Sequence, residues 1–241
     1  MKNKKKNTKN RKRKVIIGLV ILAVVAAGII FFVWNAGKKE EVVEKGHFIE
    51  KQEEKIEYAD IATAQKGDTV SFGDYNGAID WTVLAADNDK LLLLTSKCIE
   101  KRAYHTEETE ITWEQCEMRK WLNQTFYETA FSEKEKAQIQ KTKVVNKDND
   151  AFETRGGKTT KDYVFLLSIE EAETYFSETG ERMTSFTDGN GGWWWLRSPG
   201  FQETDAANIG DYGNVNKAGH KVYDKYVVNG GVRPAIWITR K

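Results

Sequence analysis

Hydrophobic and polar residues follow three different patterns along the chain. Residues 15–34 form an apolar run without a charge, and twenty residues in a helix would rise about 30 Å, the thickness of a bilayer core. Residues 35–56 are rich in charge, which predicts a solvated stalk. From residue 57 onward, short apolar segments alternate with turns that contain Gly or Asn. We therefore expect a transmembrane helix, a charged stalk and one folded domain over residues 57–241.

The first part of this domain has the patterns of a β-sheet. Residues 68–75 alternate between apolar and polar positions and end in a turn that contains Gly. Residues 79–87 and 90–99 flank the short segment NDK, which is typical of a hairpin. Leu91–Leu94 are apolar at every position, so we expect a central strand that is buried on both faces.

Helices are expected in the middle of the domain. Residues 112–131 have apolar side chains at roughly helical spacing. A Ser or Thr followed three residues later by Glu or Gln favours a helix start, because each side chain can bond the other residue's backbone N–H. The pairs at the expected helix starts are Thr112 with Gln115, Ser132 with Glu135 and Ser168 with Glu171. Strands, then helices, then strands again predict the α+β class.

Two aromatic segments near the C-terminus have the pattern of buried strands. The stretch GGWWWLRSPG at residues 191–200 has bulky apolar side chains on both faces of an extended backbone, and GGVRPAIWI at 230–238 has a matching form. Three consecutive exposed tryptophans would leave a large apolar patch, which favours a core position. The expected structural core motif consists of Trp194, Arg197, Arg233 and Trp237.

The arginines of this motif need partners if they are buried. A guanidinium has five N–H donors, and leaving them unpaired away from water is costly. Carboxylates within residues 170–173 or 203–211 are candidate partners of Arg197 and Arg233. We also expect each guanidinium to stack on a tryptophan of its own strand face.

Several motifs in order resemble a known but uncharacterised domain family. They are GDTVSFGDY, TWEQCEMRKWLNQTFYETAF, DYVFLLSIEEAETYF, WWLRSPG and GVRPAIWI, and together they span about residues 60–241. The family occurs in surface and secreted proteins of Gram-positive bacteria. The ending also resembles the C-type-lectin-like fold, which formylglycine-generating enzymes share. This second resemblance implies a single C-type-lectin-like domain and does not transfer an activity.

The charge distribution predicts a location and partners. Residues 1–14 carry nine basic and no acidic residues, and removing nine from the net charge of +1 leaves residues 15–241 at −8. The positive-inside rule places the N-terminus in the cytoplasm and the domain outside a single-pass cell membrane. The lipid bilayer around 15–34 and anionic lipid at the basic tail are the expected partners, and nucleic acid is not. A cleaved signal peptide is the alternative, since Ala26, Ala27 and Ala36 could precede a cut.

The sequence does not match the catalytic or metal-binding motifs compared below, so we expect no catalytic residue, metal or cofactor. Formylglycine chemistry uses a cysteine pair near the C-terminal motifs, whereas Cys98 and Cys116 lie in the first half. Ser198 lacks the first glycine of the Gly-x-Ser-x-Gly hydrolase elbow, because Leu196 stands two residues before it, and the three histidines are far apart in sequence. The cysteines form either a disulfide, which an extracellular location permits, or two buried thiols.

The function expected from these observations is a binding or sensing module of the bacterial cell surface. Its ligand, a glycan, peptide or protein, is unknown. The candidate surface is the Asn-, Gly- and Tyr-rich stretch 203–226, because loops held by a rigid scaffold often carry recognition. The candidate ligand-binding residues are Asp205, Asn208, Tyr212, Asn214 and Asn216. Asn, Asp and Gly also form ordinary turns, so this stretch need not bind anything. The alternative function is an enzyme that modifies the cell envelope.

Overall fold

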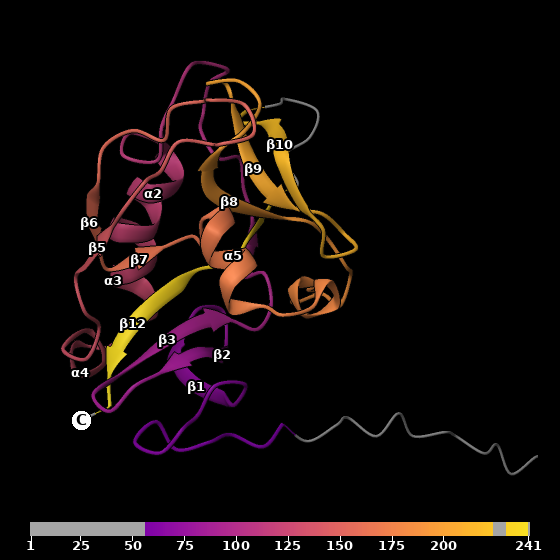
Figure 1. The fold of residues 1–241 in the computed structure, drawn as a ribbon. Coiled ribbons are helices and arrows are strands. Elements are labelled where there is room, and N and C mark those ends of the chain that lie inside the picture. The colour runs from indigo at the N-terminus through magenta and orange to yellow at the C-terminus, as the bar shows by residue number, and fades with distance from the viewer. Residues whose placement is uncertain (1–55, 224–229, 241) are drawn as a thin grey trace, which may run out of the picture. The chain divides into compact units, whose positions relative to one another are not determined.

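The computed structural model describes residues 56–223 and 230–240 (Figure 1). The chain divides into two compact units, Met1–Glu53 and Glu54–Lys241, and all described residues belong to the second. The expected basic tail at 1–14, the expected span at 15–34 and the stalk up to residue 55 therefore lie outside the described residues.

One five-stranded sheet contains the central strand that the sequence predicts. Its order is β1 (Thr69–Asp74), β2 (Ala78–Ala86), β3 (Lys90–Thr95), β12 (Ala235–Thr239) and β7 (Val164–Phe165). The strand β3 is in the middle, and Leu91–Leu94 are at most 1% exposed. The C-terminal strand β12 is antiparallel to both β3 and β7, so residues from both ends of the domain share this sheet.

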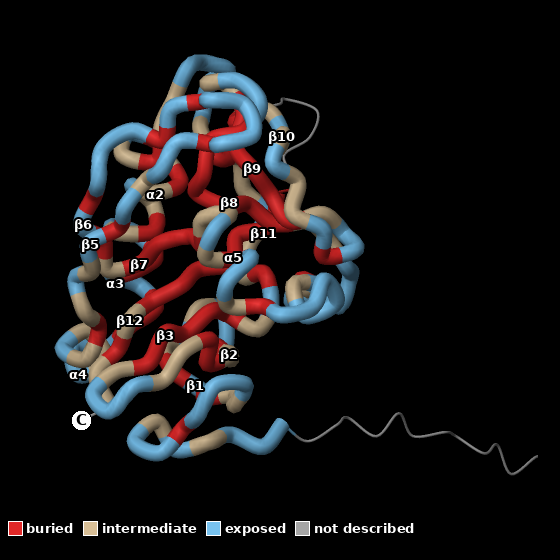
Figure 2. Tube along the Cα trace, viewed as in Figure 1, coloured by how far each residue is buried: buried red, intermediate tan, exposed pale blue. Residues whose placement is uncertain are grey.

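A second five-stranded sheet is built around the tryptophan stretch. Its order is β10 (Val215–Lys221), β9 (Asp205–Ile209), β8 (Trp194–Pro199), β11 (Gly231–Val232) and β4 (Glu100–Lys101). Every residue of β8 is buried, as the continuous red segment in Figure 2 shows. The segment from β11 to β12 passes from one sheet to the other, and Arg233 lies between these two strands.

The remaining elements are short and cover the sheets. They are the hairpin β5 (Thr142–Val144) and β6 (Thr160–Asp162), the helices α2 (Glu117–Trp121), α3 (Tyr127–Ala130), α4 (Glu133–Lys136) and α5 (Ile169–Tyr175), the π-helix η1 (Leu122–Phe126) and the 3₁₀-helix η2 (Thr179–Arg182). The segments α2, η1 and α3 follow one another on one side of the molecule (Figure 1).

The α+β class expected for the folded domain is wrong. The structure is mainly β-sheet. The longest single α-helix of the described residues, α5, has seven residues, and α2, η1 and α3 join into one helical run from Glu117 to Ala130. Within residues 56–223 and 230–240, no helix is long and apolar enough to cross a membrane. The helical segments that the sequence predicts do form, but they are short beside the two five-stranded sheets.

The helix predicted over residues 112–131 forms only in part. It begins only at Glu117, because residues 112–116 form a turn in which the amide of Cys116 donates to the carbonyl of Thr112. The buried indole of Trp113 donates to the carboxylate of Asp162, which ties this turn to β6. The two other predicted capping boxes, at Ser132 and Ser168, are confirmed.

Candidate functional site

Most of the candidate binding stretch at 203–226 is a hairpin of two paired strands. Asp205 and Asn208 are buried in β9. The amide of Asn216 in β10 donates to Oδ1 of Asn208 at 2.9 Å and to the carbonyl of Gly219 at 3.3 Å. These polar side chains are buried or hydrogen-bonded within the hairpin, so they are not arranged as an open recognition loop.

Two of the candidate residues lie on the turn of this hairpin. Tyr212 is 80% exposed, the highest value among the large hydrophobic side chains of the described residues. Asn214 is exposed as well, and its carbonyl accepts from the amide of Gly210. The structure therefore brings Asn208 and Asn216 together, while Tyr212 and Asn214 lie apart from them on the turn.

Arg197 is buried in β8 and uses all its donors. Its Nη1 and Nη2 form a two-pronged ion pair with the carboxylate of Glu171, which lies within the predicted range 170–173. The remaining N–H groups donate to Oδ1 of Asn146 and to the carbonyls of Leu166 and Val145. No donor of this guanidinium is left for a ligand.

Arg233 is also buried but has no carboxylate partner among the described residues. Its Nε donates to the carbonyl of Thr95 at 2.7 Å. Its Nη1 has no hydrogen-bond partner among the residues that the structure describes. Burial lowers the pKa of Arg233 to about 10. Its guanidinium lies 5.1 Å from the ring centre of Trp194, whereas Trp237, on its own strand face, is partly buried beside Lys90.

The two cysteines are free and buried, so the disulfide alternative is wrong. Burial raises the pKa of Cys98 and of Cys116 to about 12. The sulfur of Cys116 instead caps α2, because it accepts the amide of Arg119 at 3.4 Å. Thiols with so high a pKa supply almost no thiolate near neutral pH and are poor nucleophiles.

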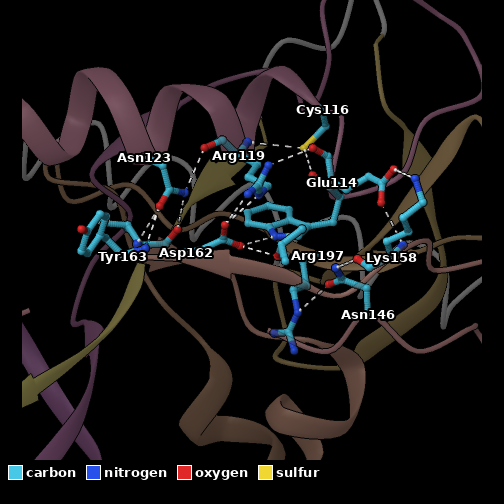
Figure 3. Close-up of polar contacts among 12 residues, drawn as sticks. Glu114, Cys116, Arg119, Asn123, Asn146, Lys158, Asp162, Tyr163 and Arg197 are labelled. Atoms are coloured by element: carbon cyan, nitrogen blue, oxygen red, sulfur yellow. Dashed lines mark hydrogen bonds and ion pairs between the residues drawn. The ribbon is translucent and has the colours of Figure 1, made fainter. Parts of the chain in front are cut away.

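A carboxylate that the sequence analysis missed organises the other side of the molecule. Asp162 ends β6 with a fully buried side chain. Its Oδ2 accepts from Trp113 at 2.9 Å and from Thr160 at 2.7 Å, and its Oδ1 accepts from Nε of Arg119 at 2.8 Å (Figure 3). The only sequence signal was an acidic residue immediately before the apolar segment YVFLL.

A cleft of about 370 Å³ opens beside this network, between α2–η1 and the β5–β6 hairpin. We call it the basic cleft. It is lined by Glu114, Gln115, Cys116, Arg119, Lys120, Asn123, Gln124, Lys141, Lys161 and Tyr163. Four of these side chains are basic and one is acidic, so the lining is cationic although residues 15–241 as a whole are acidic.

The π-helix η1 joins the two walls of the basic cleft. Oδ1 of Asn123 accepts the amides of Tyr163 at 2.8 Å and Val164 at 3.2 Å, and its Nδ2 donates to the carbonyl of Val164 (Figure 3). The ring of Tyr163 stacks on Tyr127 with ring centres 4.5 Å apart. The hydrogen bonds of Asn123 to the backbone therefore hold the two walls of the cleft together. Single π-turns such as η1 often occur at functional sites.

The charges around the basic cleft are unevenly paired. Arg119 is paired with Asp162, and Glu114 is paired with Lys158 outside the lining at 3.4 Å. Lys120 lies 3.1 Å from Glu117. Lys141 and Lys161 form no ion pair with any residue that the structure describes, and the ammonium of Lys141 lies 5.1 Å from the ring centre of Tyr163. Two positive charges are therefore available at the cleft.

A family model described as a domain of unknown function, DUF6273, matches residues 88–240. The chain belongs to this family. The expectation of an uncharacterised domain family is thereby confirmed. Comparisons with curated proteins and with solved structures found no match. The C-type-lectin-like part of the expected fold gains no support, because no solved structure matches the chain.

The DUF6273 match begins between β2 and β3, but the folded unit is larger. Strand β2 pairs with β3 along its length, and β1 pairs with β2. Phe72 and Trp81 of these strands are buried in the core. The DUF6273 domain of this chain therefore needs residues before 88 to complete its first sheet.

A second cleft of about 370 Å³ in the DUF6273 domain differs in its charge pairing. It lies beside the start of α5 and β10, and its lining includes Arg197 and Ser198. Three ion pairs neutralise most of its charge, namely Lys147 with Glu170, Lys217 with Glu173 and Arg197 with Glu171.

In residues 56–223 and 230–240, no group of three or more His, Cys, Asp or Glu side chains could hold a metal ion.

Proposed function

We propose that this DUF6273 domain is a non-catalytic binding module and that the basic cleft is its ligand site. The observation that carries the proposal is the pair of lysines, Lys141 and Lys161, that line a concave surface without a carboxylate partner among the described residues. Concave sites with a few convergent polar groups are the usual places for ligands. The walls are held by Asn123 and Asp162, so the site is largely formed before a ligand arrives.

The chemistry of the lining favours binding over catalysis. Cys116 is the one thiol in it, and its pKa of about 12 leaves it protonated. The carboxylate of Glu114 accepts from both the amide and the ammonium of Lys158, and Asp162 behind the wall is fully buried. A general base must reach the proton that it removes, and neither carboxylate is free to do so.

A role at the bacterial cell surface is part of this proposal. It rests on the charge difference between residues 1–14 and the rest of the chain. The ligand would then be a component of the surroundings or of the cell envelope. The competing hypothesis is an enzyme that acts on the cell envelope, and the experiment below distinguishes the two.

The test is an array of glycans and peptides probed with the full chain. The double variant Lys141→Gln/Lys161→Gln should lose the array signal. Lys134→Gln is the matched control, because this exposed lysine on α4 lies outside the cleft lining. It should bind like the parent. An unchanged signal in the double variant, or turnover of an array compound that one substitution abolishes, would contradict the proposal.

A further inference from the structure

We propose that the ligand of the basic cleft carries a phosphate monoester group, which Lys141 and Lys161 bind as its charge partners. This inference rests on the proposed binding function of the same cleft. It adds the chemical class of the ligand, which the binding function alone leaves open.

The charge balance of the cleft matches a phosphate monoester. Such a group carries about −1.5 to −2 charges near pH 7. Lys141 and Lys161 together supply two positive charges that no described carboxylate neutralises. Both lysines are exposed, so their side chains can move onto a ligand without disrupting the core. A group with a single negative charge would leave one of the two ammonium groups unmatched.

The state of the only arginine in the lining argues against a carboxylate ligand. Carboxylates are bound best by the flat fork of a guanidinium, which donates two parallel hydrogen bonds. In Arg119, Nε and Nη2 lie 2.8 and 2.7 Å from Oδ1 of Asp162, and Nη1 donates to the carbonyl of Glu114 at 2.9 Å. The forked edge is thus occupied by Asp162. Lysine ammonium groups remain, and these bind phosphate as point charges.

The size and the neutral groups of the cleft indicate a small ligand. Its volume of about 370 Å³ is at the lower end of the range for small-molecule sites, roughly 300–1,000 Å³. Gln115 and Gln124 are exposed in the lining and make no side-chain hydrogen bond to another described residue. Their amide groups can donate to phosphate oxygens or to the alcohol part of an ester.

The experiment is calorimetric titration of the full chain at constant ionic strength. The probes are inorganic phosphate, glycerol 3-phosphate and malonate, a dicarboxylate with two negative charges. We expect both phosphates to bind and malonate to bind at least about tenfold more weakly. Lys141→Gln and Lys161→Gln should each weaken phosphate binding about tenfold or more, the usual effect of losing a charged hydrogen bond. Lys134→Gln should leave the Kd unchanged, and Lys141→Arg should retain binding because it keeps the charge.

The outcomes separate this inference from the proposed function. Equal binding of malonate and phosphate, or phosphate binding that neither cleft variant weakens, would overturn the phosphate assignment. If no phosphate binds but the array ligand is still lost in the double variant, the ligand class is wrong and the binding function stands. If phosphate does not bind and the double variant gives the same array signal as the parent, both proposals are wrong.

Discussion

The guanidinium of Arg197 illustrates at the residue scale how a conspicuous motif serves the core. It is 4% exposed, and its five N–H groups all have acceptors. Arg197→Lys keeps the charge but loses the fork toward Glu171. We expect the free energy of unfolding to fall by about 2 kcal/mol or more, measured by urea denaturation. A variant that unfolds like the parent but no longer binds ligand would show that Arg197 is a binding residue instead.

The buried thiols predict a pH dependence of stability. In the folded chain the pKa of Cys98 and of Cys116 is about 12, above the ordinary value of 9.0 for a free thiol. Between these values the unfolded chain releases thiol protons that the folded chain keeps, so unfolding becomes easier as pH rises. The free energy of unfolding should fall from about pH 9 toward pH 12.

A thiol-free variant is the control for that pH dependence. In Cys98→Ala/Cys116→Ser the serine can take over the cap of α2, because Ser is a favoured N-cap residue. Its stability should decline less steeply than that of the parent between pH 9 and 10. Equal slopes for the two proteins would contradict the assignment of raised thiol pKa values.

At the scale of elements, Asp162 connects α2 to the β5–β6 hairpin. Asp162→Asn removes a fully buried charge and leaves Arg119 without its partner. Removing one member of a buried pair typically costs about 3–5 kcal/mol, and we expect a loss of this order in thermal unfolding. Glu117→Gln is the matched control, since it breaks only the exposed pair with Lys120 and should change stability little. Similar effects of the two substitutions would argue against the anchoring role of Asp162.

Local patterns in the sequence predicted helix starts and strands well, but they did not predict contacts between residues far apart along the chain. The capping boxes at Ser132 and Ser168 form as expected, because each needs only residues three positions apart. The helix at 112–131 starts late because Trp113 bonds Asp162, 49 residues further along the chain. The stretch 203–226 was expected to be an open binding loop because Asn and Gly suit both loops and hairpin turns.

The same distinction applies to the candidate site. Glu171 lies within the range expected for a partner of Arg197 because the segment just before α5 bonds β8, where the amide of Arg197 donates to the carbonyl of Leu167. The basic cleft could not be found from the sequence. Lys141 and Lys161 are ordinary lysines in an acidic domain, and only pairing of β5 with β6 places them opposite α2.

At the scale of the whole molecule, the matched family segment is smaller than the unit expected to fold. A chain that begins at residue 88 lacks β1 and β2, so one side of β3 loses its partner strand. It also loses the buried side chains of Phe72 and Trp81. We expect residues 56–241 to unfold cooperatively on heating and residues 88–241 to aggregate or unfold without a transition. Cooperative unfolding of the shorter chain would contradict this boundary.

The central claim is that ligand binds at the basic cleft and not at the hairpin turn that the sequence favoured. Hydrogen exchange of the full chain, measured by mass spectrometry with and without the ligand found on the array, tests it most directly. We predict protection in residues 114–124 and 160–163, which form the walls of the cleft. Protection confined to residues 210–214, the turn that carries Tyr212 and Asn214, would contradict the account.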